Sequence, residues 1–333
     1  MKQIFFALMI ACPFLLFAQK KQPYTPSELA KSVVGLETVR EFVDDDIESR
    51  KQVVLQENLN GKIIKDSLDK AIKKIMSETK RTLASSVFVI YQSKRYLISA
   101  LHVFRYDGSD PMYSGAPFPR FIRVPSIGDS IDREVHLQFG IAEGRKGAWE
   151  FSDLDTDLAV IGLDEKERVD SASNFVKNHS EFANYLEKHG HKPLPVEMID
   201  ATLDIKIGEE VFGLGFPTQS IVATFSGKNV SSIFPKGSMV AELYYINGVV
   251  SNIGKNQPLM VLNMSSLPGC SGGPIFKGHK LIGILSSMTV GYIYDNNRNP
   301  IPYFSPVPLA KAAKSTSILP LIEKLRKRLD SSR

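Results

Sequence analysis

The feature that most constrains the fold of this chain is a series of short apolar runs, rich in β-branched residues, that begins at Ser85. The runs are separated by residues that favour turns, such as Gly, Asn, Asp and Ser. Many short strands joined by turns are typical of an all-β sandwich or of β-barrels, and not of a fold in which strands and helices alternate. The predicted strands are 85–92, 96–103, 133–139, 158–163, 210–214, 221–225, 240–246, 259–262, 275–276, 281–285 and a segment around Tyr303.

Helical patterns flank this β-rich part. Between residues 26 and 82, apolar residues recur at spacings of three and four, and the tetrapeptide TPSE at 25–28 is typical of a helix start. The dense charges of this segment are expected to form a solvated face, with a partner-binding arm as the alternative. From Ser317 to Leu329, apolar residues follow one side of a basic helix. We expect this helix to pack on its own barrel rather than to lie on a membrane surface.

The first eighteen residues have the pattern of an export leader. Lys2 supplies a positive charge, an apolar run extends from Ile4 to Phe17, and Ala18 is a small residue before a charged stretch. The run is shorter than the roughly 20 residues that a membrane-spanning helix needs. We therefore expect cleavage after Ala18 and export to the periplasm or the medium. A retained anchor and a lipid on Cys12 are the alternatives. The mature chain would keep one cysteine, Cys270, and so no intramolecular disulfide.

Charge and composition argue against several functional classes. Lys and Arg number 41 against 36 Asp and Glu, a modest excess that is concentrated in the C-terminal tail. The body of the chain has no basic cluster beside aromatic residues, so nucleic-acid binding is not expected. The pair His189 and His191 lacks a third ligand for a metal, and Gly213-Leu214-Gly215 lacks the third glycine of a dinucleotide site. We expect neither a metal nor an organic cofactor.

The strongest local signal is the peptide PGCSGGPIF at residues 268–276. A nucleophilic serine needs a tight turn that exposes its oxygen, and backbone N–H groups nearby to bind an oxyanion. Glycines allow both the unusual dihedrals and the close approach of substrate. Ser271 is therefore the candidate nucleophile. The alternative is an ordinary surface turn, because Ser and Gly dominate turns in general.

A serine nucleophile needs a base, and the base needs a group that orients it. Among six histidines, His102 stands out because it follows the predicted strand ISAL, whose small residues leave room beside its ring. Asp157 directly precedes the apolar run LAVIGL, a natural way to bury one carboxylate beside an imidazole. Asp153 and Asp155 are near in sequence but do not meet that run.

The order His, Asp, Ser in these contexts resembles the chymotrypsin-like (trypsin-fold) serine peptidases. ISALHV is similar to the His motif of that family, DTDLAVIGL to its Asp strand and PGCSGGPIF to its nucleophile loop, and the match covers Thr82 to Pro308. IKIGEEVFGLGFP at 205–217 is similar to the first strand of the second barrel in the bacterial, disulfide-free branches, which include glutamyl-endopeptidase-like and heat-shock-protease-like members.

The resemblance implies a mostly β fold of two antiparallel barrels, with the catalytic groups between them. The expected segments are 1–18 as the signal peptide, 19–82 as a helical extension, 83–195 as the first barrel with a connecting segment, 196–316 as the second barrel and 317–333 as the basic helix.

It also implies roles for single residues. Ser271 would be the nucleophile, His102 the general base and Asp157 the orienting carboxylate, and the amides of Gly269 and Ser271 would form the oxyanion hole. Ser286 matches the strand that pairs with the substrate backbone, and Ser265 the floor of the specificity pocket. The expected function is a serine endopeptidase that acts on a polypeptide through an acyl-enzyme and needs no cofactor.

Two positions depart from the family. Cys270 stands where animal digestive members carry an aspartate that pairs with a new N-terminus, and a thiol cannot form that ion pair. Cysteine as the nucleophile is an alternative, but in the family the nucleophile immediately precedes Gly-Gly, and that residue is Ser271. Met288 stands where glycine is frequent beside the pocket, so its bulk is expected to narrow the pocket or displace substrate.

The rival hypothesis is a silent or latent peptidase-fold protein that binds peptides or partners, since fold alone does not guarantee function. The N-terminal extension could inhibit the enzyme or support self-association through its helices. No integral membrane span is expected once the leader is removed.

Overall fold

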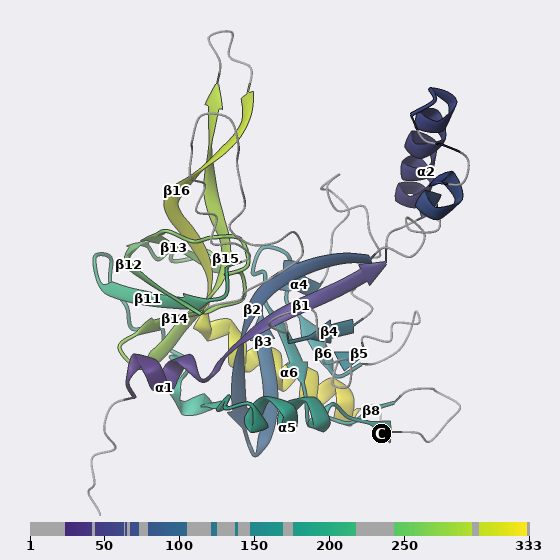
Figure 1. The fold of residues 1–333 in the computed structure, drawn as a ribbon. Coiled ribbons are helices and arrows are strands. Elements are labelled where there is room, and N and C mark those ends of the chain that lie inside the picture. Colours follow the sequence, from purple (N-terminus) through teal and green to yellow (C-terminus); the bar gives the residue numbers. More distant parts are fainter. Residues whose placement is uncertain are drawn as a thin grey trace, which may run out of the picture.

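The computed structural model describes residues 24–41, 44–62, 64, 67–72, 79–104, 121–124, 137–138, 147–168, 176–217, 243–294 and 300–331. These residues form two large β-sheets, antiparallel except for one short strand, with helices at their margins (Figure 1). The predicted fold class, mostly β with a C-terminal helix, is confirmed, and one of the two sheets is a closed barrel, which is consistent with the expected double-barrel fold. The predicted leader, residues 1–18, lies outside the described residues.

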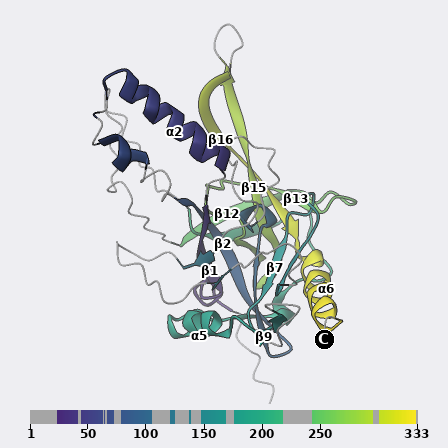
Figure 2. The same ribbon diagram turned by 90° about the vertical axis from the view of Figure 1, so that its right-hand side faces the viewer.

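The N-terminal segment differs from the predicted helical extension. It begins with α1 (Pro26–Ala30), where Thr25 and Glu28 form a capping box and Pro26 occupies the first turn. The chain then becomes β1 (Val33–Glu41) instead of continuing as a helix. The prediction of a helix is wrong for residues 33–41. The valines and the threonine of this segment favour a strand, and β1 lies within a sheet that buries both of its faces. The only long helix described before residue 79 is α2 (Asp44–Leu59), which stands away from the sheets (Figures 1 and 2).

The first sheet has the strand order β5-β4-β1-β2-β3-β7-β6. Strand β2 pairs with β1 from Val33↔Val87 to Glu41↔Thr79, and with β3 on its other side. Strand β10 pairs in parallel with β2 at Leu194↔Val89, next to the point where β1 begins. The bounds of these strands are β2 (Thr79–Tyr91), β3 (Lys94–Ser99), β4 (Phe121–Arg123), β5 (Leu137–Gln138), β6 (Trp149–Phe151), β7 (Ala159–Gly162) and β10 (Leu194–Pro195).

The second sheet is a closed barrel in the order β11-β12-β13-β16-β15-β14. Its strands agree with the predicted runs at 210–214, 259–262, 275–276 and 281–285, and with the segment around Tyr303. The predicted strand at 221–225 and the first part of that at 240–246 lie outside the described residues. The bounds are β11 (Glu210–Gly215), β12 (Tyr244–Asn252), β13 (Leu259–Met264), β14 (Pro274–Lys277), β15 (Lys280–Tyr294) and β16 (Pro300–Lys314).

The segment between the two sheets contains the small strands β8 (Glu167–Arg168) and β9 (Val176–Lys177), the helix α5 (Ser180–Lys188) and the 3-10 turn η2 (Val196–Met198). This agrees with the mixed helix and loop predicted there. Helix α5 buries Phe182, Ala183 and Leu186 against the first sheet.

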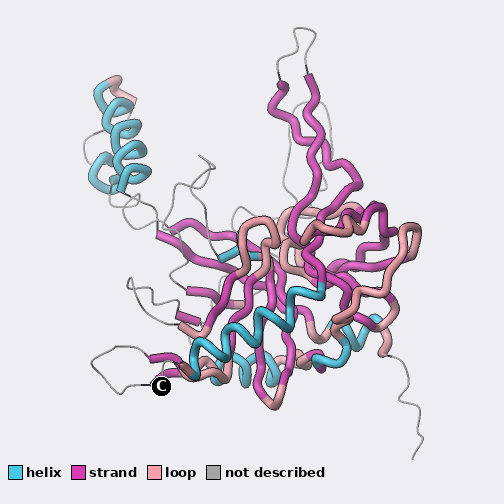
Figure 3. The backbone as a smooth tube through the Cα atoms, turned by 180° about the vertical axis from the view of Figure 1, so that it is seen from behind, coloured by secondary structure: helices cyan, strands magenta, loops and turns pink. Residues whose placement is uncertain are grey.

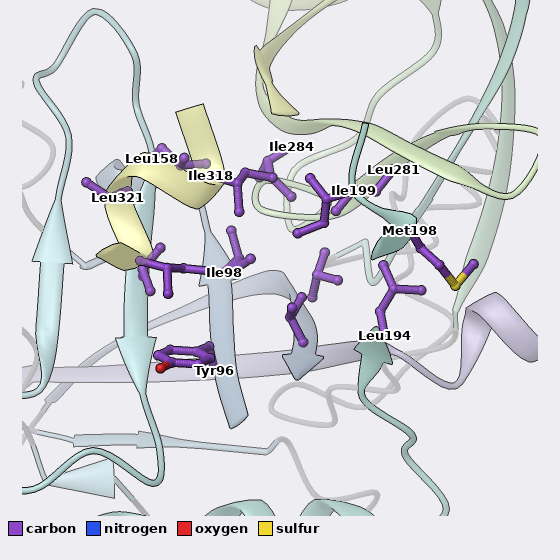
Figure 4. Packing of buried hydrophobic residues seen from close by; sticks show 14 of the residues in the cluster. Tyr96, Ile98, Leu158, Leu194, Met198, Ile199, Leu281, Ile284, Ile318 and Leu321 are labelled. Carbon is purple, nitrogen blue, oxygen red and sulfur yellow. The ribbon is translucent and has the colours of Figure 1, made fainter. Parts of the chain in front are cut away.

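Three apolar clusters stabilise the fold. One lies within the first sheet and α5, and one fills the closed barrel. The third joins the two sheets: Figure 4 shows Tyr96 and Ile98 of β3 packed in one cluster with Ile199, Leu281 and residues of the C-terminal helix. Because this cluster takes residues from both sheets, its burial fixes how the sheets sit against each other.

The C-terminal helix α6 (Ile318–Asp330) confirms the predicted amphipathic helix and its packing on the protein itself. It lies against the strands of the first sheet and contacts β6 and β7 (Figure 3). The Arg328 guanidinium donates to the Glu150 carboxylate at 2.8 Å and to the carbonyls of Gly147 and Trp149. Among the described residues, no helix is long and apolar enough to cross a membrane.

Shortening Leu325 tests the packing of α6. Its side chain is fully buried in the cluster between the sheets, so Leu325→Ala should lower the free energy of unfolding by about 2–5 kcal/mol. Lys327 lies on the exposed side of the same helix, and Lys327→Ala should change it by less than about 0.5 kcal/mol. Urea unfolding followed by circular dichroism measures both variants. Equal losses in the two variants would contradict the packing described here.

Candidate active site

His102 and Asp157 meet at one end of the first sheet. His102 lies in the short helix α4 (Leu101–Phe104), which directly follows β3, and Asp157 directly precedes the run that enters β7. Asp157 has φ of 50°, a left-handed conformation that Asp tolerates better than most residues. Its Oδ1 accepts the backbone N–H of His102 at 2.9 Å, and its Oδ2 lies 2.8 Å from the imidazole Nδ1. The carboxylate therefore fixes both the backbone and the ring of His102.

The environment of Asp157 favours its ionised form. Burial of the carboxyl group raises its pKa, but the hydrogen bonds and charge of His102, together with the Ser286 hydroxyl, outweigh burial and hold the pKa below its usual value. The Ser286 hydroxyl donates to Asp157 Oδ2 at 2.5 Å. An ionised carboxylate can only accept at Nδ1, so in the neutral tautomer that suits this contact the proton is on Nδ1 and the lone pair is on Nε2. The His102 side chain is 47% exposed, which leaves that nitrogen accessible.

Ser271 lies in a tight turn of the second barrel, between β13 and β14. The Cys270 N–H donates to the Leu267 carbonyl at 3.1 Å, which closes a four-residue turn. Pro268 and Gly269 are its central residues, and Gly269 has φ of 91°. Proline followed by a glycine of positive φ is the signature of a type II turn. The glycine before Cys270 is therefore required by the backbone itself.

The backbone N–H groups of this loop fall into two sets. Those of Cys270, Gly272 and Gly273 each donate to a carbonyl oxygen, at 3.1, 2.7 and 2.9 Å. Those of Gly269 and Ser271 have no acceptor among the residues that the structure describes. Backbone N–H groups left without an acceptor are rare in native proteins, and Gly269 is buried. Two such donors beside one serine are the kind of groups that bind an oxyanion in acyl transfer.

Ser85, on β2 of the first sheet, holds this loop from the other side. Its N–H donates to the Ser271 carbonyl at 2.8 Å, and its hydroxyl donates to the Gly269 carbonyl at 2.8 Å. The same hydroxyl oxygen accepts the Phe216 N–H at 2.8 Å. Ser85 thus binds the carbonyls of the two residues whose N–H groups have no acceptor. Ser85 is not among the residues predicted from the sequence.

The loop and the first sheet approach so closely that only glycine fits at position 272. A Cβ placed on Gly272 would lie 2.0 Å from the Ser85 carbonyl oxygen and 2.0 Å from the Ser99 hydroxyl oxygen. The Ser99 hydroxyl donates to that same carbonyl at 2.7 Å. Gly272, the first glycine of the Gly-Gly pair, is therefore needed for the close contact between the two sheets as well as for the turn.

Ser286 links the two halves of the site. It lies on β15, and besides its bond to Asp157 its carbonyl accepts the Ser271 hydroxyl at 3.2 Å. Ser286 thus lies between Ser271 and Asp157, and the described residues show no direct hydrogen bond between Ser271 and His102. Met288, which was predicted to lie beside the specificity pocket, is farther along β15 and is half-buried. Ser265, which was predicted to form the floor of that pocket, lies just after the end of β13 and is exposed.

Metal-binding geometry is not found in the described part of the chain: no group of three or more His, Cys, Asp or Glu side chains is placed to hold an ion there. The His189 ring instead packs on Tyr185, with ring centroids 4.0 Å apart, and its Nδ1 lies 2.8 Å from the Tyr185 carbonyl.

No protein-family model and no curated protein matches this chain. Solved structures similar to it include an HtrA-type protease with a decapeptide (16% identity, TM-score 0.41, covering 90% of this chain and 65% of that one). A second is a thermostable serine protease, AL20, from an extremophilic microorganism (11% identity, TM-score 0.45, covering 90% of this chain and 99% of that one). A third is the protease Anisep from Arthrobacter nicotinovorans (13% identity, TM-score 0.41, covering 74% of this chain and 90% of that one). The chain spans less than two thirds of the HtrA-type protease. At TM-scores below 0.5, these likenesses carry no conclusion about activity.

Cys270 provides a test of which side chain in the loop is reactive. Its thiol is fully buried, and burial raises its pKa to about 11 despite a hydrogen bond with the Leu267 backbone. At about pH 8 the thiolate is therefore scarce, and iodoacetamide should leave Cys270 unmodified in the folded protein and modify it after unfolding in urea. Peptide mapping separates it from Cys12. Rapid modification of the folded protein would contradict this assignment.

Proposed function

We propose that this chain is a serine endopeptidase of the chymotrypsin-like fold, with Ser271 as nucleophile, His102 as general base and Asp157 as the carboxylate that orients it. The observation that carries the proposal is the pair of N–H groups without acceptors, at Gly269 and Ser271, in a turn that also holds a serine hydroxyl. The hydrogen-bonded pair of His102 and Asp157, which Ser286 connects to that serine, supports it.

The reaction would proceed in two steps, formation and hydrolysis of an acyl-enzyme, which use the same catalytic groups. The Ser271 oxygen attacks the carbonyl carbon of a peptide bond while its proton moves to Nε2 of His102. The negative oxygen of the tetrahedral intermediate accepts the two free N–H groups. As the C–N bond breaks, the imidazolium returns the proton to the leaving amine. Water then attacks the acyl ester in the same way and releases the acid.

Each environment suits its role. The lowered pKa of Asp157 keeps a negative charge beside the imidazolium that forms during attack, and this charge stabilises it. In the resting structure the Ser271 hydroxyl donates to the Ser286 carbonyl. A substrate N–H that takes this carbonyl as its acceptor frees the hydroxyl for His102. Pairing with β15 and activation of the nucleophile are then coupled.

Ser85 would act as a positioning residue. It touches neither substrate nor reacting atoms, but its bonds to the Gly269 and Ser271 carbonyls fix the turn that carries both oxyanion donors. Catalysis by such donors depends on their being fixed before the charge develops. Part of the catalytic rate would therefore depend on the Ser85 hydroxyl, which belongs to the opposite sheet.

Fluorophosphonate labelling of the protein, followed by peptide mapping, tests the proposal. These reagents report a serine that a base has activated, so label should appear on Ser271. Ser271→Ala should abolish the label, and His102→Ala should abolish nearly all of it, while circular dichroism shows both variants folded. A folded wild-type protein that takes no label, or substantial peptide hydrolysis by Ser271→Ala, would refute the assignment and favour a binding role.

Two neighbouring serines allow an effect on the geometry of the active site to be distinguished from an effect on the stability of the fold. Ser85 and Ser86 are both fully buried on β2, but the Ser86 hydroxyl donates to the Val34 carbonyl at 3.2 Å, away from the loop. Each change to alanine should lower the free energy of unfolding by about 1–3 kcal/mol. Only Ser85→Ala should lower kcat, about tenfold or more, with a smaller change in KM. Equal effects of the two variants on kcat would remove Ser85 from the site.

A further inference from the structure

Asp157 has a backbone conformation that its surroundings must hold in place. Its φ of 50° lies in the left-handed region, which residues other than glycine rarely occupy. Such conformations cost free energy, persist only where the surrounding structure fixes them, and cluster at active sites. Whatever fixes the backbone of Asp157 therefore also fixes the carboxylate that binds His102.

Asp153 closes the turn that leads into Asp157. Its carbonyl oxygen accepts the Asp157 N–H at 3.1 Å, and its carboxylate Oδ1 accepts the Thr156 N–H at 2.7 Å. The second bond is that of a side chain that caps the start of a helical turn, and a left-handed residue commonly ends such a turn. Because Thr156 is buried, loss of the carboxylate would leave the N–H group of a buried residue without this partner, which costs free energy.

The charge of Asp153 strengthens this cap. The hydroxyl and the N–H of Thr156 hold the pKa of the Asp153 carboxyl below its usual value, and the charge of Lys324 on α6 acts in the same direction. Asp153 is therefore ionised at neutral pH. Hydrogen bonds to an ionised acceptor are stronger than those between neutral groups.

Ser152 and Leu158 close the loop at its base. The Ser152 N–H donates to the Leu158 carbonyl at 2.9 Å, and the Leu158 N–H donates to the Ser152 hydroxyl oxygen at 2.8 Å. The Asp157 carbonyl accepts the N–H of Leu101, the residue before His102, at 3.2 Å. Both backbone groups of Asp157 are thus bonded, the N–H within the turn and the carbonyl to α4. The direction of its side chain is therefore set by the turn as well as by His102.

Asp155, the other carboxylate that lies near Asp157 in the sequence, provides the contrast. It is exposed, and among the residues that the structure describes its carboxylate has no hydrogen-bond or ion-pair partner. Asp153 and Asp155 carry the same side chain, two residues apart in the same loop. They differ in what the side chain contacts, so Asp155 is a matched control for Asp153.

We propose that Asp153 is a positioning residue: by closing the turn 153–157 it holds Asp157 in the conformation that places its carboxylate on the N–H and the Nδ1 of His102. Asp153 touches neither substrate nor reacting atoms. Its effect on catalysis rests on the proposed function, whereas its effect on the contact between Asp157 and His102 does not. His102 and the Ser286 hydroxyl also bind the Asp157 carboxylate, so loss of Asp153 should loosen this contact and not abolish it.

Proton NMR of the full-length protein at low temperature tests the contact itself. An imidazole proton shared with a carboxylate resonates far downfield, and this signal should be present in the wild type and absent from Asp157→Ala. Asp153→Ala should move the signal upfield or broaden it, because the bond between Nδ1 and Oδ2 lengthens, whereas Asp155→Ala should leave it unchanged. No signal in the wild type, an unchanged signal in Asp153→Ala, or equal changes in the two alanine variants would overturn the proposal.

Peptide hydrolysis tests the consequence for catalysis. Asp153→Ala should lower kcat about tenfold, the usual effect of losing a cap on an equilibrium, and should change KM less than about twofold. Asp153→Asn keeps an oxygen that can accept the Thr156 N–H, so it should retain kcat within about threefold. Asp155→Ala should match the wild type. An asparagine variant as slow as the alanine variant would contradict the cap and overturn the proposal.

Ser152→Ala tests the same turn if Asp153→Ala does not fold, which circular dichroism shows. It removes the hydroxyl that accepts the Leu158 N–H, and it should move the NMR signal in the same direction as Asp153→Ala. Ser152→Thr keeps a hydroxyl and should restore the signal. An unchanged signal in folded Ser152→Ala would overturn the proposal.

Failure of this proposal and failure of the proposed function give different results. A wild-type protein that takes no fluorophosphonate label, but whose downfield signal changes in Asp153→Ala, would retain the role of the turn and reject the enzyme. Label on Ser271, with the same signal and the same kcat in Asp153→Ala as in the wild type, would retain the enzyme and reject the role of Asp153.

Discussion

The contact between Ser85 and the loop of Ser271 is the interaction on which the site depends. The candidate base and its carboxylate belong to the first sheet, and the candidate nucleophile belongs to the second. Ser85 joins them through two hydrogen bonds of 2.8 Å to loop carbonyls, and Ser286 joins them again through Asp157. Both links need the sheets at a fixed distance. The apolar cluster between the sheets, closed by α6, provides that distance.

The candidate catalytic groups could be proposed from the sequence because each occupies a local sequence pattern. A turn that exposes a serine needs glycines beside it, a buried carboxylate needs an apolar strand beside it, and both patterns are visible in a few residues. Ser85 could not be found in this way. Its hydroxyl bonds a carbonyl 184 residues away, and one serine at the start of an apolar strand carries no mark of that partner.

The same reasoning explains which elements were predicted correctly. Helix α6 lies on the surface of the protein, so only one of its sides is apolar. The apolar residues therefore recur at helical spacings, and this pattern predicted the helix. Strand β1 is buried on both faces from Val33 to Thr38, so it shows no alternation, and its apolar residues fell by chance at helical spacings. The long pair of strands β15 and β16 was predicted only in its inner part, because register and edge are properties of pairing and not of one segment.

The central claim is that groups from two sheets assemble one nucleophilic serine, and trapping the acyl-enzyme tests it most directly. The wild-type protein is mixed with an activated peptide ester, quenched in acid at increasing times and analysed by intact mass and peptide mapping. The account predicts one acyl group per chain, located on Ser271, which forms before free acid accumulates and is lost by hydrolysis. An acyl group on Cys270, or none on a folded protein, would contradict it.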